Sequence, residues 1–378
     1  MIPLNPDLSG LKRSAIRRFT NLANETPGCI KLTIGEPDFD TPQPIKDAAA
    51  AALAAGQTHY APNQGIPALR KAVADYETKR GMAVTPEQVL VTSGATGALY
   101  TALTGILHPG DEVIVPVPAF VLYESIITAA GAKMVPLDIS KTGFQIDKNA
   151  LCALITPRTR AIILNSPNNP SGVVLSRESL AAVKAAVLDH DIWILCDNVY
   201  QLLTEGECPD LSLDEDLRDR LLLCQSFSKP YAMTGWRAGY LVGPEKVIER
   251  LLLLHAAMVA SVPTFIQTAC VAALCWDTAP MAAVYTRRRG FVTRRLREMG
   301  LAFPEPEGAF YAFVDISAFG MDSETFCTRL IREAGVAAVP GSCFGTEGFI
   351  RLSCACGDEE LAEGMNRLEK FVKSLKIR

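Results

Sequence analysis

A lysine that closely follows a buried strand is the feature that most constrains what this chain can fold into. The run Leu221–Cys224 is apolar throughout, as expected for a strand inside a sheet, and Lys229 comes shortly after it. An unpaired ammonium group is costly in an apolar setting, so we expect a chemical role for this amine. Burial lowers the pKa of a lysine and allows it to form a Schiff base with an aldehyde.

Groups that can bind phosphate surround this lysine. Ser226 and Ser228 supply hydroxyls and Arg237 supplies a guanidinium. An amine that binds an aldehyde beside a phosphate site suggests pyridoxal 5′-phosphate (PLP) as the cofactor. A lone Ser-Lys pair would more often be a surface turn, but here Ser-Phe-Ser-Lys precedes Met-Thr-Gly-Trp-Arg-x-Gly-Tyr within residues 226–240. This longer string resembles the cofactor-lysine segment of class I/II aminotransferases, which are PLP enzymes of fold type I.

Polar residues that follow other apolar runs fit the same resemblance. Asp197 ends the run Ile192–Cys196, and a carboxylate at the end of a buried strand needs a cation. The resemblance implies that the pyridinium nitrogen of PLP is this cation, so that Asp197 keeps the ring an electron sink. It also implies that Tyr200 and Asn169 bind the phenolic oxygen of PLP. Asn169 belongs to the family hallmark Asn-x-Pro-Asn-Asn-Pro-Ser-Gly at residues 165–172.

A strand-to-helix turn completes the predicted phosphate site. The run Val89–Thr92 is followed by the small residues Gly94, Ala95 and Thr96, and a helix is predicted over 98–107. Backbone N–H groups in such a turn can bind an anion with the help of the helix dipole. We therefore expect these three residues to bind the same phosphate as the serines and the arginine described above.

Two aromatic residues enter the predicted site through the resemblance alone. Phe120 matches the family position whose ring stacks on the pyridine ring, worth about 1 kcal/mol beyond burial, although a core position would suit it equally well. Tyr60 matches the tyrosine that reaches the phosphate of the neighbouring subunit, although it could simply pack on a turn. If Tyr60 has this role, the active protein is a homodimer.

Two positions near opposite ends of the chain are predicted to hold the substrate. Gly35 ends a strand-like run, and in the resembling family its backbone approaches the substrate carboxylate, which a Cβ would prevent. Arg351 lies in the apolar run Phe349–Ser353 with no local acid, and a buried guanidinium favours a bidentate carboxylate. The resemblance implies that Arg351, together with Asn169, binds the α-carboxylate of the substrate. A salt bridge to a distant acidic residue is the alternative.

The order of the apolar runs predicts an α/β fold. Strands alternate with helices over residues 45–285, which indicates a large PLP-binding domain whose mostly parallel sheet is flanked by helices, of the seven-stranded type in the resembling family. Residues 286–378 predict a smaller α+β domain that includes a strand at Pro306–Val314. Residues 1–44 are expected to form an N-terminal arm, with a short basic helix near 11–24, and part of the small domain. Ligands bind at the carboxyl ends of such strands, where the polar residues described above lie.

Composition and charge argue against other classes of protein. The chain has 378 residues, is 49% hydrophobic and carries a formal net charge of −4 without a basic block, so we expect no nucleic-acid partner. The apolar stretch Leu251–Trp276 is interrupted by Pro263 and by polar residues, which favours two buried helices over a membrane span. The eleven cysteines lack metal-ligand spacing. With no export signal, we expect free thiols and no metal site in a cytoplasmic protein.

Together these residues predict a PLP-dependent aminotransferase. Lys229 would hold PLP as a Schiff base and move a proton while an amino group passes from an L-amino acid to a 2-oxo acid by a ping-pong mechanism. Two alternatives stay open: a PLP-dependent carbon–sulfur β-lyase, which shares the fold and the cofactor lysine, and a non-catalytic PLP-binding regulatory protein. The substrate side chain is not identified, because a dicarboxylate substrate would need a further cation and several residues, including Lys31 and Arg13, could supply it.

Overall fold

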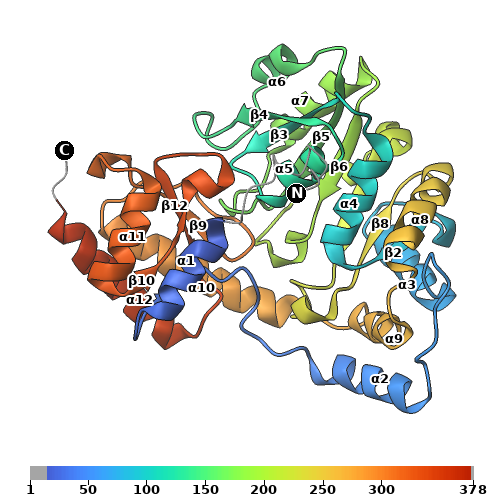
Figure 1. The fold of residues 1–378 in the computed structure, drawn as a ribbon, viewed down its shortest axis with the longest axis horizontal. Helices are drawn as coiled ribbons and strands as arrows, with labels where there is room; N and C mark the ends of the chain where they lie inside the picture. The colour runs from blue at the N-terminus through green and yellow to red at the C-terminus, as the bar shows by residue number, and fades with distance from the viewer. Residues whose placement is uncertain (1–14, 376–378) are drawn as a thin grey trace, which may run out of the picture.

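A seven-stranded sheet forms the centre of the larger region of the molecule (Figure 1). The computed structural model describes residues 15–375. The strand order is β2-β8-β7-β6-β5-β3-β4, and every pairing is parallel except the two made by β8. The strands are β2 (Val89–Thr92), β3 (Glu112–Val117), β4 (Lys133–Asp138), β5 (Thr159–Asn165), β6 (Trp193–Asp197), β7 (Leu221–Ser226) and β8 (Gly239–Val242). The predicted α/β fold with a mostly parallel sheet is therefore confirmed.

Helices cover both faces of this sheet, and β7 shows why its sequence is apolar throughout. Leu221 and Leu223 pack into the hydrophobic cluster on one face, whereas Leu222 and Cys224 pack into the cluster on the other. Successive side chains of a strand point to opposite faces, so a strand covered on both sides has no exposed position. The first face is covered by α2 (Gln43–Ala54), α3 (Pro67–Lys79), α6 (Lys148–Leu154), α7 (Arg177–Leu188) and α9 (Thr264–Ala273), and the second by α4 (Gly94–Ile106), α5 (Leu122–Ala129) and α8 (Glu245–Val259).

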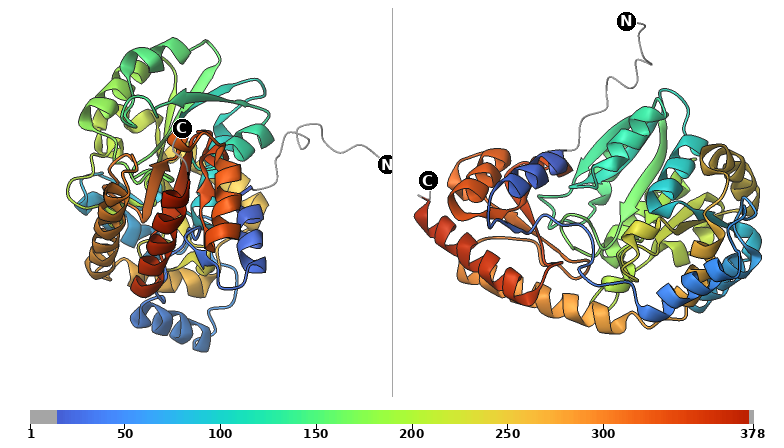
Figure 2. Two further views of the ribbon diagram at one scale, coloured as in Figure 1. Left: turned by 90° about the vertical axis from the view of Figure 1, so that its left-hand side faces the viewer. Right: turned by 60° about the horizontal axis from the view of Figure 1, so that its bottom comes forward.

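The smaller region combines segments from both ends of the described chain. Its strands are β1 (Ile30–Lys31), β9 (Tyr311–Asp315), β10 (Val336–Ala337), β11 (Val339–Pro340) and β12 (Phe349–Ser353), and its helices are α1 (Ala15–Glu25), α10 (Ala279–Glu298), α11 (Ser323–Ala334) and α12 (Asp358–Ser374). β1 pairs with β10 in parallel, and β11, β12 and β9 form an antiparallel sheet. Figure 2 shows α1 beside the C-terminal elements, where Phe19 joins Phe326 and Phe371 in one core.

One helix crosses the boundary that the sequence predicted between the two domains. α10 is 20 residues long and runs without a break through the predicted boundary between residues 285 and 286 (Figure 1). Tyr285, on its N-terminal half, and Leu296, on its C-terminal half, are both fully buried in the core of the smaller region. The domain limits predicted from the sequence stay predictions.

Short 3-10 helices lie in the connections between these elements. They are η2 (Pro86–Gln88), η3 (Gln201–Leu203), η4 (Leu211–Leu213), η5 (Glu215–Arg220), η6 (Thr234–Trp236), η7 (Ser317–Phe319) and η8 (Gly341–Phe344). The segment between β7 and β8, which contains η6, carries the lysine and the arginine of the predicted cofactor site.

Several local predictions need correction. The strand predicted at Pro306–Val314 begins only at Tyr311, because Ala309 adopts a positive φ of 55° that interrupts an extended chain. α4 begins at Gly94 instead of near residue 98, so the predicted phosphate donors occupy its first turn. The helix expected near 11–24 is observed as α1, and its residues 11–14 lie outside the described residues.

The long apolar stretch is divided near Pro263, as predicted. α8 ends at Val259, and Pro263 directly precedes α9. The prediction that both pieces are buried is wrong for one face of α8, because Leu253 is 63% exposed and Met258 is 40% exposed. Within residues 15–375, no helix is both long enough and apolar enough to cross a membrane.

Candidate active site

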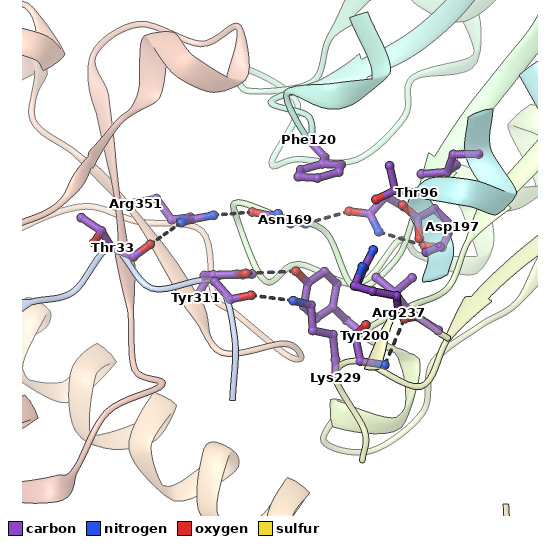
Figure 3. Close-up of a pocket in the computed structure, with 17 residues that line it drawn as sticks. Thr33, Thr96, Phe120, Asn169, Asp197, Tyr200, Lys229, Arg237, Tyr311 and Arg351 are labelled. Carbon is purple, nitrogen blue, oxygen red and sulfur yellow. Dashed lines mark hydrogen bonds between the residues drawn. The ribbon is translucent and has the colours of Figure 1, made fainter. Parts of the chain in front are cut away.

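A cavity of about 240 Å³ lies at the carboxyl ends of the parallel strands, where the two regions meet (Figure 3). It brings together most of the residues that the sequence predicted for the site. Those that line the cavity are Gly35, Ala95, Thr96, Phe120, Asn169, Asp197, Tyr200, Ser226, Ser228, Lys229, Arg237 and Arg351. Two predicted residues do not line it: Gly94, which packs behind it, and Tyr60.

Asp197 ends β6 and carries an oxygen atom with no partner. Its Oδ2 accepts a hydrogen bond of 2.5 Å from the hydroxyl of Tyr123, whereas its buried Oδ1 has no hydrogen-bond partner among residues 15–375. Asn165 on the neighbouring strand donates to the backbone carbonyl of Asp197 at 2.8 Å. Burial raises the pKa of Asp197 to about 6, against the opposing effects of the Tyr123 hydroxyl, the backbone N–H of Val199 and the Lys229 ammonium. A cationic N–H donor in the cavity would satisfy this carboxylate.

Lys229 points into the cavity from the loop that follows β7. Its Nζ donates to the carbonyl oxygen of Gly35 at 2.6 Å. Burial lowers the pKa of Lys229 to about 8. Glu36 acts against this shift, and the nearby guanidinium groups of Arg351 and Arg237 reinforce it. A fraction of the amine is therefore neutral near pH 7 and can act as a nucleophile.

The first turn of α4 and the loop after β7 form a tightly packed anion cradle. Gly94 has a φ of +69°, which favours glycine, and a Cβ added there would lie 2.8 Å from Nη2 of Arg237. Gly239 is constrained by rigid backbone, because its Cβ would lie 2.6 Å from the carbonyl oxygen of Gln225 and 2.7 Å from the carbonyl carbon of Gly94. Arg237 itself has a left-handed conformation, with φ 55°, and donates to the carbonyl of Thr234 at 2.9 Å. Backbone N–H groups, hydroxyls and a guanidinium thus converge as a phosphate requires.

Arg351 lies on the opposite side of the cavity, in β12, and is 3% exposed. Its Nη1 donates to Oδ1 of Asn169 and its Nη2 donates to the carbonyl of Thr33, each at 2.9 Å. Both partners are neutral, and Arg351 forms no ion pair with any described residue. The alternative of a salt bridge to a distant acid is therefore not observed in the described part of the chain. This buried charge is available for an anionic ligand.

Four residues that belong to the site were given no role from the sequence. Tyr123 donates to Asp197, and Asn165, which is part of the hallmark at residues 165–172, lines the cavity. Thr33 and Tyr311 also line it, and the hydroxyls of Tyr311 and Tyr200 are 3.0 Å apart. These residues lie inside apolar or family-typical strings, which gave no separate signal.

The surroundings of three further positions are clear. Phe120 lines the cavity across from Tyr200 and Lys229 in Figure 3 and makes an edge contact with Tyr123, with ring centroids 5.7 Å apart. Tyr60 is 90% exposed, so its predicted role across a subunit interface stays a prediction. The side chain of Asn198 donates to Asp210 at 3.0 Å and does not line the cavity.

The cavity fits PLP on three independent observations. The unpartnered Oδ1 of Asp197 suits a pyridinium N–H, the cradle at Gly94 and Arg237 suits a phosphate, and the amine of Lys229 suits an aldehyde. The three groups line one cavity, as a single ligand that carries all three functions requires.

Comparison with known proteins agrees with this chemistry. Residues 27–368 match the family model described as aminotransferase class I and II. The chain is 41% identical to an aspartate aminotransferase of Pyrococcus horikoshii, over 97% of this chain and 96% of that protein, and 40% identical to an aspartate/prephenate aminotransferase of Thermus thermophilus, over 91% of each. The solved structure of an aspartate aminotransferase from Thermotoga maritima superimposes with a TM-score of 0.94, at 36% identity, over 98% of this chain and 100% of that one.

The chain therefore belongs to the class I and II aminotransferase family. It is a PLP-dependent aminotransferase, which moves an amino group from an L-amino acid to a 2-oxo acid by a ping-pong mechanism. The aminotransferase prediction is therefore confirmed.

Proposed function

We propose that Lys229 is the residue that holds the cofactor and moves the proton during transamination. The observation that supports this role is the position of its Nζ within the cavity that Asp197 and Arg351 also line, with a pKa lowered to about 8. When bound, PLP supplies a ring that accepts the electron pair left on the α-carbon of the substrate. Nζ of Lys229 removes the α-proton, holds it as an ammonium and then releases it. Asp197 would keep the ring nitrogen of the bound cofactor protonated, and Tyr200 and Asn169 would donate to its phenolic oxygen.

The test of this role is the substitution Lys229→Ala. We expect the variant to lose steady-state turnover and the yellow absorbance of the PLP-loaded protein. Lys184 offers a matched control, because it pairs with Asp214 and Asp216 and does not line the cavity, so Lys184→Ala should keep both properties. Sustained transamination by Lys229→Ala would contradict the assignment.

We also propose that Arg351 binds the α-carboxylate of the substrate. Its two Nη atoms are held by neutral acceptors, Asn169 and Thr33, which leaves the charge of the guanidinium uncompensated. A carboxylate would accept two parallel N–H bonds and neutralise that charge. Gly35 lies beside this position, and its missing Cβ would stand 3.2 Å from the hydroxyl of Tyr311, so the space is already tight.

We propose that the charges that one protomer contributes to the cavity favour a substrate with an uncharged side chain. Lys229, Arg237 and Arg351 are the cations that line it among residues 15–375, and the proposed function assigns each of them a partner. Lys31 does not line the cavity, and Arg13 lies outside the described residues. We propose that one protomer supplies no further cation that could bind the side-chain carboxylate of a dicarboxylate substrate.

A panel of amino acids mixed with the PLP-loaded protein tests this preference. The rate at which the yellow band disappears gives kcat/KM for each amino donor. We expect the best uncharged donor to exceed aspartate at least tenfold, which corresponds to about 1.4 kcal/mol. A preference for aspartate would overturn this part of the proposal.

We further propose a cytoplasmic homodimer in which Tyr60 reaches the phosphate site of the partner. Its 90% exposure supports a role outside its own protomer, and the eleven free thiols support a reducing compartment. Tyr60→Phe should weaken PLP binding about tenfold, through loss of one charged hydrogen bond. A mixed dimer of Tyr60→Phe and Lys229→Ala chains should regain one tight site. If Tyr60 acts within its own protomer, the mixed dimer should regain no tight site.

The cytoplasmic location has a separate test. Recovery of the native protein from a secreted fraction would contradict it.

A further inference from the structure

Tyr311 connects two side chains to which the proposed function gives different tasks. Its hydroxyl lies 3.0 Å from the hydroxyl of Tyr200, and the centre of its ring lies 4.4 Å from the guanidinium carbon of Arg351 (Figure 3). Tyr200 follows β6 of the large sheet, whereas Tyr311 begins β9 of the smaller region. We propose that Tyr311 is a positioning residue that fixes the hydrogen bonding of Tyr200 and the orientation of Arg351 together.

The direction of the hydrogen bond follows from counting protons. Tyr200 has a single hydroxyl proton, and the proposed function directs it to the phenolic oxygen of the cofactor. Tyr311 must then donate its own proton to the oxygen of Tyr200. A donor whose oxygen accepts another hydrogen bond is polarised and becomes a stronger donor, so Tyr311 strengthens the contact that Tyr200 makes with the cofactor.

The surroundings of Tyr311 keep it protonated and fixed. Burial raises the pKa of its phenol, while Arg351 and Tyr200 act in the opposite direction and Cys354 adds to the increase. The hydroxyl also packs against Gly35, where a Cβ would approach it to 3.2 Å. The hydroxyl therefore has one position and, among the described residues, one hydrogen-bond partner.

The ring of Tyr311 acts on the substrate side. The guanidinium carbon of Arg351 lies over this ring and also over the ring of Phe344, whose centre is 5.0 Å away. Aromatic faces attract a cation, so the two rings help to hold the guanidinium where its Nη atoms donate to Asn169 and Thr33. Hydroxyl and ring thus have separable tasks within one residue.

This inference rests on the proposed role of Lys229, and a pH titration of the PLP-loaded protein tests it without measuring activity. In Tyr311→Phe the ring remains and the hydroxyl is lost. Without the hydroxyl of Tyr311, Tyr200 becomes a weaker donor, and more negative charge stays on the phenolic oxygen of the cofactor. This charge holds the proton on the nitrogen that links Lys229 to the cofactor more tightly. We expect the yellow band to persist to a pH about half a unit higher, roughly a threefold change in proton affinity. KM for the amino donor should change less than twofold.

Two further variants separate the tasks of Tyr311. Tyr311→Leu removes the ring as well, so KM should rise about tenfold in addition to the spectral shift.

Tyr285→Phe is the matched control, because Tyr285 is a buried tyrosine of the same aromatic cluster. Its hydroxyl donates to Asp38, and Arg288 also donates to this carboxylate. This variant should lose stability without a spectral shift. Equal titration midpoints in wild type, Tyr311→Phe and Tyr285→Phe would overturn the inference. A wild-type protein without any yellow band would instead refute the role of Lys229.

Discussion

The two sides of the active-site cavity are built on different principles. The cofactor side, formed by Asp197, Lys229 and the cradle at Gly94 and Arg237, stands on the mostly parallel seven-stranded sheet, whose two faces are both covered by helices. The substrate side, formed by Thr33, Tyr311 and Arg351, stands on the antiparallel sheet of β9, β11 and β12 and on a segment close to the N-terminus. On the cofactor side, packing excludes even an added Cβ, as at Gly239, where it would meet backbone atoms of Gln225, Gly94 and Ala95. On the substrate side, Arg351 is held by neutral acceptors that a carboxylate can replace.

This difference matches the residence times that the chemistry requires. A cofactor that stays bound through many turnovers is served by a cradle that is complete before binding, because preorganisation removes the cost of ordering. A substrate that must leave after each half-reaction is served by contacts that are exchanged. The contrast can be tested by changing one side at a time.

The largest effect is expected from Asp197→Asn on the cofactor side. This substitution removes the negative partner of the ring nitrogen at a buried site, where breaking an ion pair costs about 3–5 kcal/mol. We expect kcat to fall about 10²- to 10³-fold at unchanged protein folding, measured by steady-state kinetics and circular dichroism. A loss below tenfold would show that Asp197 is not the partner of the nitrogen.

The next largest effect is expected from Arg351→Lys on the substrate side. Lysine keeps the charge but loses the bidentate geometry and the stacking on Tyr311. We expect kcat/KM for the amino donor to fall about 10²-fold while the affinity for PLP stays within twofold, measured by stopped-flow spectroscopy and cofactor titration. A parallel loss of PLP affinity would mean that the two sides are not independent.

Asp197, on the cofactor side, should also make the folding stability of the cofactor-free protein depend on pH. The pKa of Asp197 is about 6 in the folded protein against an ordinary value of 3.8, so between these values the folded state holds a proton that the unfolded state has released. Stability therefore falls as pH rises through this window. We expect cofactor-free wild type to lose up to about 3 kcal/mol relative to Asp197→Asn between pH 4 and pH 7, measured by urea unfolding. A constant difference across this range would contradict the shifted pKa.

The smallest effect is expected from Phe120→Leu. The substitution keeps an apolar side chain but removes an aromatic face, worth about 1 kcal/mol in a stacked pair. PLP should dissociate about fivefold more readily, and kcat/KM for the amino donor measured at saturating PLP should change little. An unchanged affinity for PLP would assign Phe120 to the core instead, the alternative that the sequence left open.

The sequence revealed the cofactor side better than the substrate side for a physical reason. A charged residue directly after a strand that is buried on both faces is conspicuous, and Asp197 and Lys229 were found in this way. Tyr311 lies in an apolar string, Gly-Ala-Phe-Tyr-Ala-Phe-Val at residues 308–314, where an active-site tyrosine and a core tyrosine look alike. Its role depends on Tyr200 and Arg351, which meet it only through tertiary contacts.

Local backbone conformation and helix orientation account for the remaining differences between the predictions from sequence and the structure. The positive φ of Ala309 follows from the turn in which Gly308 donates its N–H to the carbonyl of Gly172, a contact between distant segments. The exposure of Leu253 likewise depends on which face of α8 meets the sheet, because the run around it is apolar on all sides. Patterns of single residues do not encode either feature.

The unbroken helix α10 limits how the two sides of the cavity can move. A helix of 20 residues is a rod about 30 Å long, and Nη1 of Arg289, near its middle, donates to the carbonyls of Leu203 and Ala309. The two regions are therefore not joined by a flexible linker alone. A chain cut between residues 285 and 286 would divide this helix and separate Tyr285 from the half that carries Arg289 and Leu296.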